Sequence, residues 1–363
     1  MPSPQEKYQQ DLQRPDFQPD AAQAEAVRHL QRLYDDLLQQ QRRPSGLWQR
    51  LLGKKPAPPV IGLYFWGGVG RGKTYLVDTF FECLPLERKM RVHFHRFMHR
   101  VHEELKSLHN QANPLEIVAD RFKKQADIIC FDEFFVSDIT DAMLLGTLMQ
   151  ALFSRGITLV ATSNIEPDGL YRNGLQRARF LPAIELIKQH TVVVNVDSGI
   201  DYRLRTLEQA EIYHAPLDQQ AELNLTQYFH ALSDEPRQQD VAIEVANRQI
   251  QARHEADGVV WFGFRELCES ARSQYDYMEL SRCYHTVLVS GVKVMGQHND
   301  DVARRFIALV DEFYERNVTL ILSAETELEA LYQGGLLSFE FKRCISRLQE
   351  MQSHEYLARA HLP

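Results

Sequence analysis

The sequence has 363 residues, of which 44% are hydrophobic and 25% charged, a composition typical of a globular protein large enough for two folding units. The formal net charge of −8 argues against nucleic-acid binding over the whole surface, although it allows a local basic groove. Five scattered cysteines without a C-x-x-C pair indicate reduced residues of a cytosolic protein rather than a disulfide framework.

No segment approaches the roughly 18 consecutive apolar residues that a membrane-spanning helix needs. The nearest stretch, residues 142–153, is interrupted by Thr147 and Gln150. The first seven residues lack the apolar run of a signal peptide, and their acidic character is unlike a mitochondrial presequence. We therefore expect a soluble, cytoplasmic protein.

The first 59 residues predict a helix and a basic, proline-rich connector. Asp20 is the expected N-cap of an amphipathic helix whose apolar face comprises Ala26, Leu30, Leu33, Leu37 and Leu38. Asp20 and Gln23 are also candidates for contact with an adenine base, with capping and solvation as the alternative. Residues 42–59 read as an exposed connector, either simply solvated or binding a partner.

Residues 67–74 match the phosphate-binding pattern G-x-x-x-x-G-K-[ST] without exception. A strand-forming apolar run, 60–66, precedes them, and a helix-forming segment, 75–81, follows. Successive backbone N–H groups of such a loop and the start of the helix bind polyphosphate. An ordinary glycine turn is the alternative. The expected nucleotide-binding residues are Gly67, Gly68, Val69, Gly70, Arg71, Gly72, Lys73 and Thr74, with the Thr74 hydroxyl also on Mg²⁺.

Residues 90–102 predict a strand that turns into a helix and are rich in histidine. A metal hypothesis arises because His95, His99 and His102 would share one helical face. The arginines between them, and the lack of nearby Cys, Asp or Glu at ligand spacing, favour packing and polar contacts instead. The same applies to the flanking His93 and His109.

Residues 126–133 form an apolar strand that ends in Asp132 and Glu133, which is the Walker B pattern. We expect Asp132 to hold Mg²⁺ through a water molecule and Glu133 to polarise the attacking water. Asp132 follows Thr74 by 58 residues, which leaves room for a helix, a strand and another helix. This spacing favours ATP hydrolysis with a glutamate base over a GTPase-like switch.

Two further candidates follow the Walker B strand. Residues 139–153 predict a helix and residues 156–164 a strand, so Asn164 is expected to orient the attacking water, with a strand-end turn as the alternative. An arginine-rich passage, 170–182, then precedes a fifth strand, 190–196. In oligomeric ATPases of this arrangement an arginine here reaches the neighbouring subunit's site; Arg177 is the first candidate and Arg179 the second, with a surface salt bridge as the alternative.

Together these segments resemble the ZapE family of AAA+-like ATPases. The resemblance spans most of the chain and rests on FWGGVGRGKT, RVHFHRFMHRVH, ICFDEFFVSDITDAM, LVATSN, LYRNGLQRARFLP and FKRCISRLQEMQSHEY. It implies a cytoplasmic bacterial ATPase, recruited to the division site, that destabilises polymers of the tubulin-like division protein FtsZ. It supports roles for Lys73, Thr74, Asp132, Glu133, Asn164 and Arg177. The sensor-2 arginine usual in AAA+ lids has three candidates, Arg282, Arg343 and Arg347.

The second half of the chain contains a predicted hairpin, 242–253, and an apolar stretch, 259–268, that begins a new packed unit. Shifting the chain on itself by 161 positions aligns residues 136–184 with 297–345 and gives twelve identities. We hypothesise a repeat of helix, strand and helix, with chance similarity between periodic patterns as the alternative. Extended to the functional positions, the shift places Lys293 opposite Asp132, Val294 opposite Glu133, Glu325 opposite Asn164 and Ser338 opposite Arg177, so one ATP site per chain is expected.

The sequence therefore predicts an α/β P-loop core, 60–206, with parallel strand order 5-1-4-3-2, then a hairpin and a smaller lid-like domain, 207–363. The expected function is hydrolysis of ATP with Mg²⁺ at the subunit interfaces of a homo-oligomer that remodels a protein partner. One alternative is a replication ATPase such as a helicase loader, which the acidic charge disfavours. The other is a nucleotide-gated scaffold, which Glu133 and Asn164 disfavour.

Overall fold

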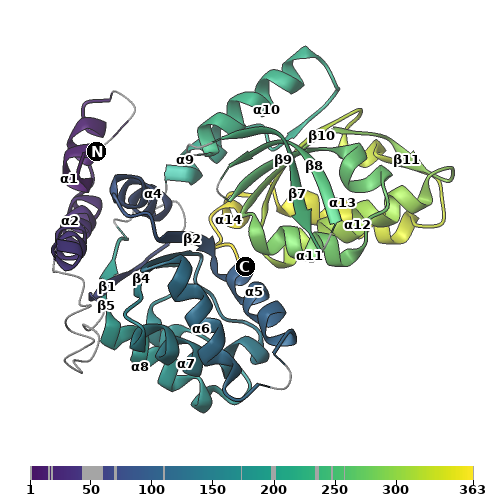
Figure 1. The fold of residues 1–363 in the computed structure, drawn as a ribbon. Coiled ribbons are helices and arrows are strands. Elements are labelled where there is room, and N and C mark those ends of the chain that lie inside the picture. Colours follow the sequence, from purple (N-terminus) through teal and green to yellow (C-terminus); the bar gives the residue numbers. More distant parts are fainter. Residues whose placement is uncertain are drawn as a thin grey trace. The chain divides into compact units, whose positions relative to one another are not determined.

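The computed structural model describes residues 2–14, 17, 19–42, 60–68, 72–108, 111–172, 174–197, 202–233, 237–246, 248–256 and 258–362. By its internal contacts the chain divides into two compact units, Met1–Ile200 (unit 1) and Asp201–Pro363 (unit 2). The sequence placed this boundary after residue 206. Each unit contains a β-sheet with helices on both faces (Figure 1).

Unit 1 alternates strands with helices, the pattern expected for a parallel sheet. Helix α7 illustrates how its elements begin, because the Asp138 carboxylate caps it by accepting a hydrogen bond from the N–H of Thr140 at 2.6 Å. The elements are α1 (Pro4–Asp11), α2 (Ala21–Arg42), β1 (Gly62–Trp66), α4 (Lys73–Cys83), β2 (Lys89–His93), α5 (Phe94–Lys106), α6 (Pro114–Gln125), β3 (Ile128–Asp132), α7 (Ile139–Ser154), β4 (Thr158–Ser163), the 3-10 turns η1 (Pro167–Gly169) and η2 (Arg177–Arg179), α8 (Leu181–His190) and β5 (Thr191–Asn195).

The sheet of unit 1 has five parallel strands in the order β2-β3-β4-β1-β5, which confirms the predicted order 5-1-4-3-2. In a parallel sheet the carboxyl ends of all strands lie at one edge, and ligands bind in the crevice outside that edge. The P-loop follows β1, Asp132 ends β3, and Asn164 follows β4. The sheet therefore gathers the predicted site residues at one edge.

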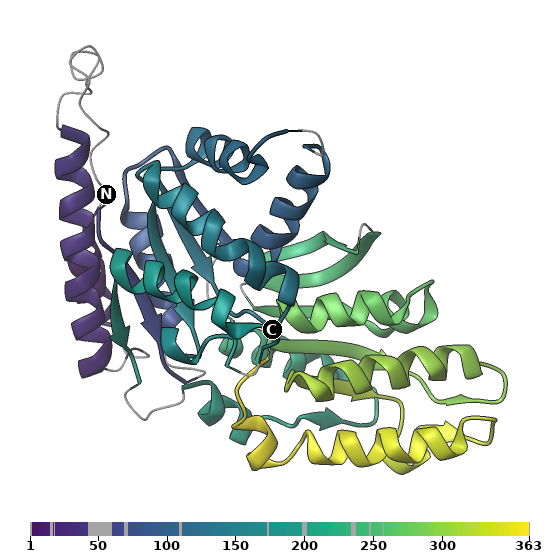
Figure 2. The ribbon, with the colours of Figure 1, turned by 90° about the horizontal axis from the view of Figure 1, so that it is seen from below.

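Each strand of unit 1 contributes to two hydrophobic cores, since successive side chains point to opposite faces of the sheet. One core lies between the sheet and helices α2 and α4 and includes Leu63, Phe65 and Cys130. The other lies between the sheet and helices α5 to α8 and includes Tyr64 and Phe131. Figure 2 shows the long purple helix α2 along one side of this sheet and teal helices along the other. The P-loop helix α4 is thus packed on the same face as α2.

Helix α2 begins as the sequence predicts. The Asp20 carboxylate accepts hydrogen bonds from the N–H groups of Ala22 at 2.8 Å and Gln23 at 3.3 Å, so Asp20 is the N-cap. Most of its predicted apolar face, Ala26, Leu30, Leu33 and Leu37, is buried. The predicted basic connector lies almost entirely outside the described residues, which resume at Val60.

Unit 2 is also an α/β unit, where the sequence predicts a smaller lid-like domain. It has a six-stranded sheet in the order β6-β12-β10-β9-β8-β7, whose first four strands are parallel. Its elements are α9 (Tyr202–Gln209), β6 (Tyr213–His214), α10 (Gln219–Leu232), β7 (Gln238–Val245), β8 (Arg248–Ala256), β9 (Val259–Gly263), the π-helical turn η3 (Arg265–Glu269), α11 (Gln274–Cys283), β10 (Thr286–Val292), β11 (Met295–Gly296), α12 (Asp300–Glu315), β12 (Thr319–Ala324), the 3-10 turn η4 (Leu328–Ala330), β13 (Tyr332–Gln333), α13 (Ser338–Glu350) and α14 (His354–Leu357).

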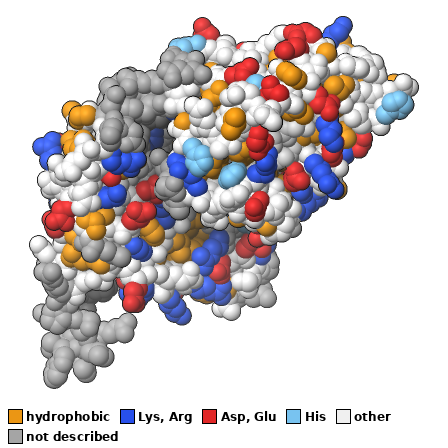
Figure 3. Space-filling view, turned by 90° about the horizontal axis from the view of Figure 1, so that it is seen from above, with side chains coloured by type: hydrophobic (Ala, Val, Ile, Leu, Met, Phe, Trp, Pro, Cys, Tyr) orange, Lys and Arg blue, Asp and Glu red, His pale blue; other side chains and the backbone are white. Residues whose placement is uncertain are grey.

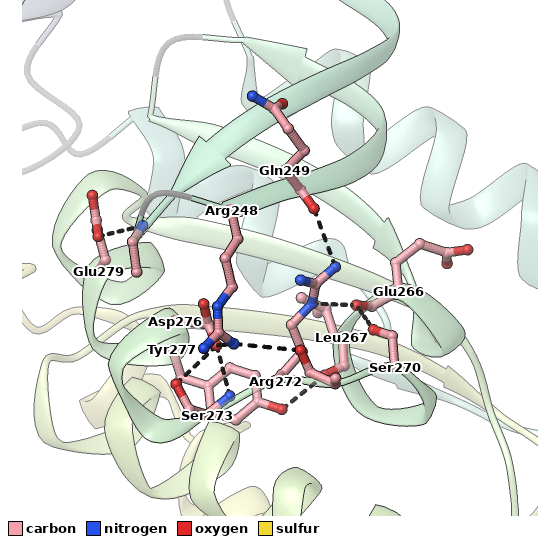
Figure 4. Close-up of polar contacts among 12 residues, drawn as sticks. Arg248, Gln249, Glu266, Leu267, Ser270, Arg272, Ser273, Asp276, Tyr277 and Glu279 are labelled. Carbon is pink, nitrogen blue, oxygen red and sulfur yellow. Dashed lines mark hydrogen bonds and ion pairs between the residues drawn. The ribbon is translucent and has the colours of Figure 1, made fainter.

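Strands β7 and β8 form the antiparallel hairpin expected from the sequence. Its turn is tied to the following elements by polar contacts (Figure 4). The N–H of Ala246 donates to the carboxylate of Glu279 at 2.7 Å, and the Arg248 guanidinium contacts the buried carboxylate of Asp276 at 3.2 Å. Because Glu279 and Asp276 both lie on α11, these contacts hold the hairpin turn against that helix.

The hypothesised repeat of helix, strand and helix is present in the structure, where α12, β12 and α13 follow one another as α7, β4 and α8 do. Elements α12, β12 and η4 begin and end 161 positions after α7, β4 and η1. The extension of this shift to the Walker B pair is wrong, however. Ile128 lies opposite Thr158 in unit 1 and Thr286 opposite Thr319 in unit 2, so β10 follows β3 by 158 positions. Asp132 and Glu133 therefore correspond to Ser290 and Gly291 rather than to Lys293 and Val294, because unit 2 has three more residues between the matched part of this strand and the next helix.

The surface combines charges of both signs. On the face seen in Figure 3, Lys and Arg side chains are interspersed with Asp and Glu. Within the ranges that the structure describes, no helix is both long and apolar enough to cross a membrane.

Candidate active site

The glycine-rich loop joins β1 to α4 and requires glycine at its end. Gly72 has a backbone φ of +75°, which residues other than glycine rarely adopt. A Cβ at this position would lie 2.6 Å from Nε2 of Gln23. Gln23, from the first turn of α2, is 5% exposed. The N-terminal helix thus supports the loop directly. Three of the predicted loop residues, Val69, Gly70 and Arg71, lie outside the described residues.

Lys73 connects the loop to the neighbouring strand. Its ammonium donates hydrogen bonds to the carbonyl oxygens of Gly67 at 2.7 Å and Gly68 at 2.6 Å, and to Oδ1 of Asn164 at 2.9 Å. Lys73 begins α4, and Asn164 follows β4, which pairs with β1. The ammonium is therefore held where the loop, the helix start and the end of β4 meet, which is the position from which it can reach a polyphosphate.

Asp132 lies at the end of β3 and is nearly buried, with 6% of its side chain exposed. Arg91 of β2 donates from Nε to its Oδ2 at 2.7 Å and also forms an ion pair with Asp78 of α4. A nearly buried carboxylate requires such a counter-charge. Thr74, in the first turn of α4, is half-buried. Its hydroxyl and the Asp132 carboxylate are hard oxygen donors of the kind that Mg²⁺ prefers.

Glu133 adopts an unusual backbone conformation directly after β3. Its φ is +49°, in the left-handed region that non-glycine residues seldom occupy. The N–H of Glu133 donates to Oγ1 of Thr162 on β4 at 3.2 Å, and its carboxylate lies 4.0 Å from Nδ1 of His93. Strained residues of this kind concentrate at functional sites. Glu133 thus combines such a backbone conformation with a position at the carboxyl end of β3.

The candidates for the trans-acting arginine, Arg177 and Arg179, lie in η2, and the sensor-2 candidates lie on α11 and α13. Arg177 is half-buried in η2 and donates to the carbonyl oxygen of Asp168 at 2.6 Å, within its own chain, whereas Arg179 is exposed. Of the sensor-2 candidates, all in unit 2, Arg343 and Arg347 form ion pairs with Asp311 of α12 at 2.8 Å and 2.6 Å.

The histidine-rich segment makes polar contacts, as favoured from the sequence. His102 of α5 contacts the carboxylate of Asp141 on α7 at 2.6 Å, and the rings of His93 and His95 lie 6.0 Å apart. Among the residues that the structure describes, no group of three or more His, Cys, Asp or Glu is placed to hold a metal ion. His109 lies outside them.

Sequence reasoning missed two groups at this edge. Arg91 could have been noticed, because Arg91 and His93 alternate with apolar residues and so share one face of a strand. Its contact with Asp132 depends on β2 lying beside β3, which one sequence does not reveal. Asp197, which follows β5, accepts a hydrogen bond from the N–H of Gly68 at 3.4 Å, and no motif indicated it.

Comparisons with known proteins show which family the chain belongs to. Residues 2–360 match the family described as AFG1-like ATPase. The chain is 55% identical to the cell division protein ZapE of Escherichia coli K12, over 99% of this chain and 98% of that protein. It is 34% identical to lactation elevated protein 1 homolog B of Danio rerio, over 83% of this chain and 69% of that protein. The crystal structure of DnaI covers 50% of this chain and is itself covered to 86%, with 17% identity and a TM-score of 0.35, too low to support an argument.

The match over nearly the whole length confirms the ZapE-family resemblance and the P-loop α/β fold predicted from the motifs. The chain belongs to the AFG1-like ATPase family and is an ATPase.

Proposed function

We propose that ATP is bound and hydrolysed at the carboxyl edge of the sheet of unit 1, with Mg²⁺. The observation that carries this proposal is the hydrogen bond between Lys73 and Asn164, which joins the P-loop helix to the strand beside it. Asp132 and Glu133 follow on the next strand, β3, which pairs with β4. A lysine, an amide and two carboxylates at adjoining strand ends form the set of groups that phosphoryl transfer to water requires.

Thr74 and Asp132 would hold Mg²⁺, which neutralises charge on the phosphates when it is bound there. The lysine ammonium stabilises the outer phosphates, and the loop N–H groups bind the remaining phosphate oxygens. Glu133 acts as the general base that polarises the attacking water, and the Asn164 amide orients that water. Each of these groups projects from a strand end or from the first turn of α4, so their positions are set by the sheet.

The site is completed by an arginine of a neighbouring subunit in a homo-oligomer. Arg177 is our first candidate, because it lies in the loop between β4 and α8 together with exposed Arg172 and Arg179. Its hydrogen bond to the Asp168 carbonyl within the same chain is compatible with this role if assembly releases the side chain. A guanidinium from another chain would offset the negative charge of the transferring phosphoryl group.

The partner we propose is a protein polymer of cell division, namely FtsZ, which the ATPase destabilises at the division site in the cytoplasm. The support comes from the relative named cell division protein ZapE, which is 55% identical over almost the full length of both chains. Similarity of this extent is the reason to test the same partner here.

Steady-state ATP hydrolysis over a wide range of protein concentration tests both proposals. We expect the rate per subunit to rise with concentration, to fall sharply in Arg177→Ala, and to change little in the matched control Arg172→Ala. Arg179→Ala distinguishes the second candidate. Polymerised FtsZ should stimulate the wild type, and light scattering should show polymer loss with ATP. A rate per subunit that is independent of concentration and of both arginines would exclude the interfacial site, and unchanged scattering would exclude FtsZ as the partner.

A further inference from the structure

Arg91 links the two elements that carry Thr74 and Asp132, the residues that would hold Mg²⁺. Its guanidinium bonds to Asp132 at the end of β3, at 2.7 Å, and pairs with Asp78 on the P-loop helix α4. The three side chains are 17%, 6% and 13% exposed, respectively for Arg91, Asp132 and Asp78. Charges this sheltered from water interact strongly and are costly to separate.

Unit 2 provides an internal comparison for this arrangement. Strands β2-β3-β4-β1 and β9-β10-β12-β6 have the same order and are all parallel. The registers agree as well, since Arg91 lies opposite Cys130 in unit 1 and Trp261 opposite Leu288 in unit 2. Cys130 and Leu288 each belong to the core on the face covered by the first helix, α4 or α10. Trp261 is therefore the counterpart of Arg91.

The backbone at the end of β3 is also repeated in unit 2. Glu133 and Gly291 both have positive φ, +49° and +76°. The N–H of each donates to a hydroxyl on the next strand, Thr162 at 3.2 Å or Ser323 at 3.1 Å. The two units therefore share a fold down to individual hydrogen bonds, so residues that differ at matched positions show what the fold itself does not require.

The differences gather at the proposed ATP site. Counted from the matched residues Phe65 and His214, seven residues precede the first helix in unit 1, 66–72, and four in unit 2, 215–218. The connection in unit 2 ends in the acidic N-cap Asp218, whereas that in unit 1 ends in Gly72. The counterparts of Asp132, Glu133, Asn164 and Arg91 are Ser290, Gly291, Glu325 and Trp261. Arg91 is thus replaced together with the residues assigned to ATP chemistry.

A guanidinium also ties sheet to helix in unit 2, but without a carboxylate on the sheet. Arg253 of β8 lies over the Trp261 ring, 4.6 Å from its centroid, and forms an ion pair with Glu222 of α10. It donates to the Ser290 hydroxyl at 3.0 Å. Fastening the first helix to the sheet is therefore a structural task common to both units. In unit 1 the guanidinium of Arg91 also engages the carboxylate at the end of β3.

We propose that Arg91 is a positioning residue for ATP hydrolysis, which holds the Asp132 carboxylate in the orientation that receives Mg²⁺. The guanidinium bonds to one carboxylate oxygen, Oδ2, and a carboxylate has acceptor sites on both of its oxygens, so it can bind Arg91 and a magnesium-bound water together. Residues that orient a metal ligand in this way typically contribute 10- to 100-fold to metal affinity. The inference rests on the proposed role of Asp132 in binding Mg²⁺.

The test measures the affinity for a fluorescent ATP analogue across a MgCl₂ titration and in excess EDTA, for the full chain and its variants. In Arg91→Met we expect the gain in affinity on adding Mg²⁺ to fall by at least about tenfold, with affinity in EDTA close to wild type, because the loop and Lys73 are unchanged. The MgCl₂ concentration for half-maximal hydrolysis should rise by a similar factor, and Arg91→Lys should restore part of both losses.

Arg253→Met is the matched control, since it removes the guanidinium that ties helix to sheet in unit 2. It should lower thermal stability and leave the Mg²⁺ dependence of nucleotide binding unchanged. If Arg91→Met does not fold, we compare Arg91→Lys with Asp78→Asn instead. Because Asp78→Asn leaves the bond between Arg91 and Asp132 intact, we expect only Arg91→Lys to reduce the gain in nucleotide affinity on adding Mg²⁺.

Wild-type Mg²⁺ dependence in the Arg91 variants would overturn the inference, as would tighter Mg²⁺ binding or equal losses with and without Mg²⁺. If the wild type itself binds nucleotide equally well in EDTA, the proposed Mg²⁺ site fails instead.

Discussion

The ammonium of Lys73 lies 2.9 Å from Oδ1 of Asn164, which joins the start of the P-loop helix to the end of β4. The two residues are 91 positions apart in the chain, and they meet because β4 pairs with β1 in the parallel sheet. The contact places an amide beside the lysine that is expected to hold the outer phosphates. This contact supports the role that we propose for Asn164, which is to orient the attacking water.

Replacement of Asn164 by alanine should separate binding from turnover. The loop N–H groups and Lys73 remain, so nucleotide affinity should stay near the wild-type value, whereas kcat should fall on the order of a hundredfold, as for other single hydrogen-bonding groups at a reacting centre. Equilibrium binding and steady-state hydrolysis measure the two effects. Asn195→Ala, at the end of the edge strand β5, is the control and should retain most of kcat. Unchanged kcat in Asn164→Ala would remove its catalytic role.

Gly72 and Gly291 form a matched pair of left-handed glycines, with φ of +75° and +76°. An alanine Cβ at Gly291 would meet nothing within 4 Å, whereas at Gly72 it would lie 2.6 Å from Gln23. Gly291→Ala should therefore cost only the conformational strain, about 1–2 kcal/mol of stability, and leave nucleotide binding intact. Gly72→Ala should also displace the loop and weaken ATP binding. Urea unfolding and nucleotide titration test this, and equal behaviour of the two variants would contradict it.

His214 should make the stability of the protein depend on pH. Its Nδ1 lies 2.5 Å from the Glu211 carboxylate and its Nε2 3.1 Å from that of Asp218, and these contacts raise the pKa of His214 above its ordinary value of about 6.5. The Asn224 amide also faces Nδ1, at 3.4 Å. Because the pKa is higher in the folded state, the stabilisation is complete below about pH 6.5 and is lost as pH rises through the raised pKa.

The check is urea unfolding of the full chain between pH 6 and 9, followed by tryptophan fluorescence, to which the buried Trp261 of the same unit contributes. The wild-type midpoint should decline with rising pH more steeply than that of His214→Gln. Parallel pH profiles for the two proteins would mean that the imidazolium contributes nothing to stability.

The sheet of unit 1 could be predicted because local sequence motifs mark its elements. A glycine-rich loop follows β1 and an acidic pair follows β3, and the spacing between them leaves room for β2 and its helices. The resulting topology places Lys73, Asp132 and Asn164 at one edge, so their proximity was predictable without side-chain detail. The proline-rich residues before β1 contain no such motif, and almost all of them lie outside the residues that the structure describes.

Contacts that depend on strand neighbours could not be predicted in the same way. Arg91 reaches Asp132 only because β2 lies beside β3, and Gln23 reaches Gly72 only because α2 packs on the face of α4. The sheet of unit 2 could not be predicted for a related reason. Its strand β6 has only two residues, and the hairpin β7–β8 interrupts the alternation of strands and helices. Three extra residues between the matched part of β10 and helix α12 then displaced the predicted counterparts of Asp132 and Glu133.

The most direct test of the account is Glu133→Gln, examined for bound nucleotide and for turnover in the same preparation. Glutamine keeps the size of the side chain but cannot act as a base, so the variant should bind one ATP per chain with an affinity close to wild type. Its kcat should fall by at least about a hundredfold, the contribution expected of a general base. A variant that hydrolyses ATP at the wild-type rate would contradict the assignment of the catalytic edge of the sheet.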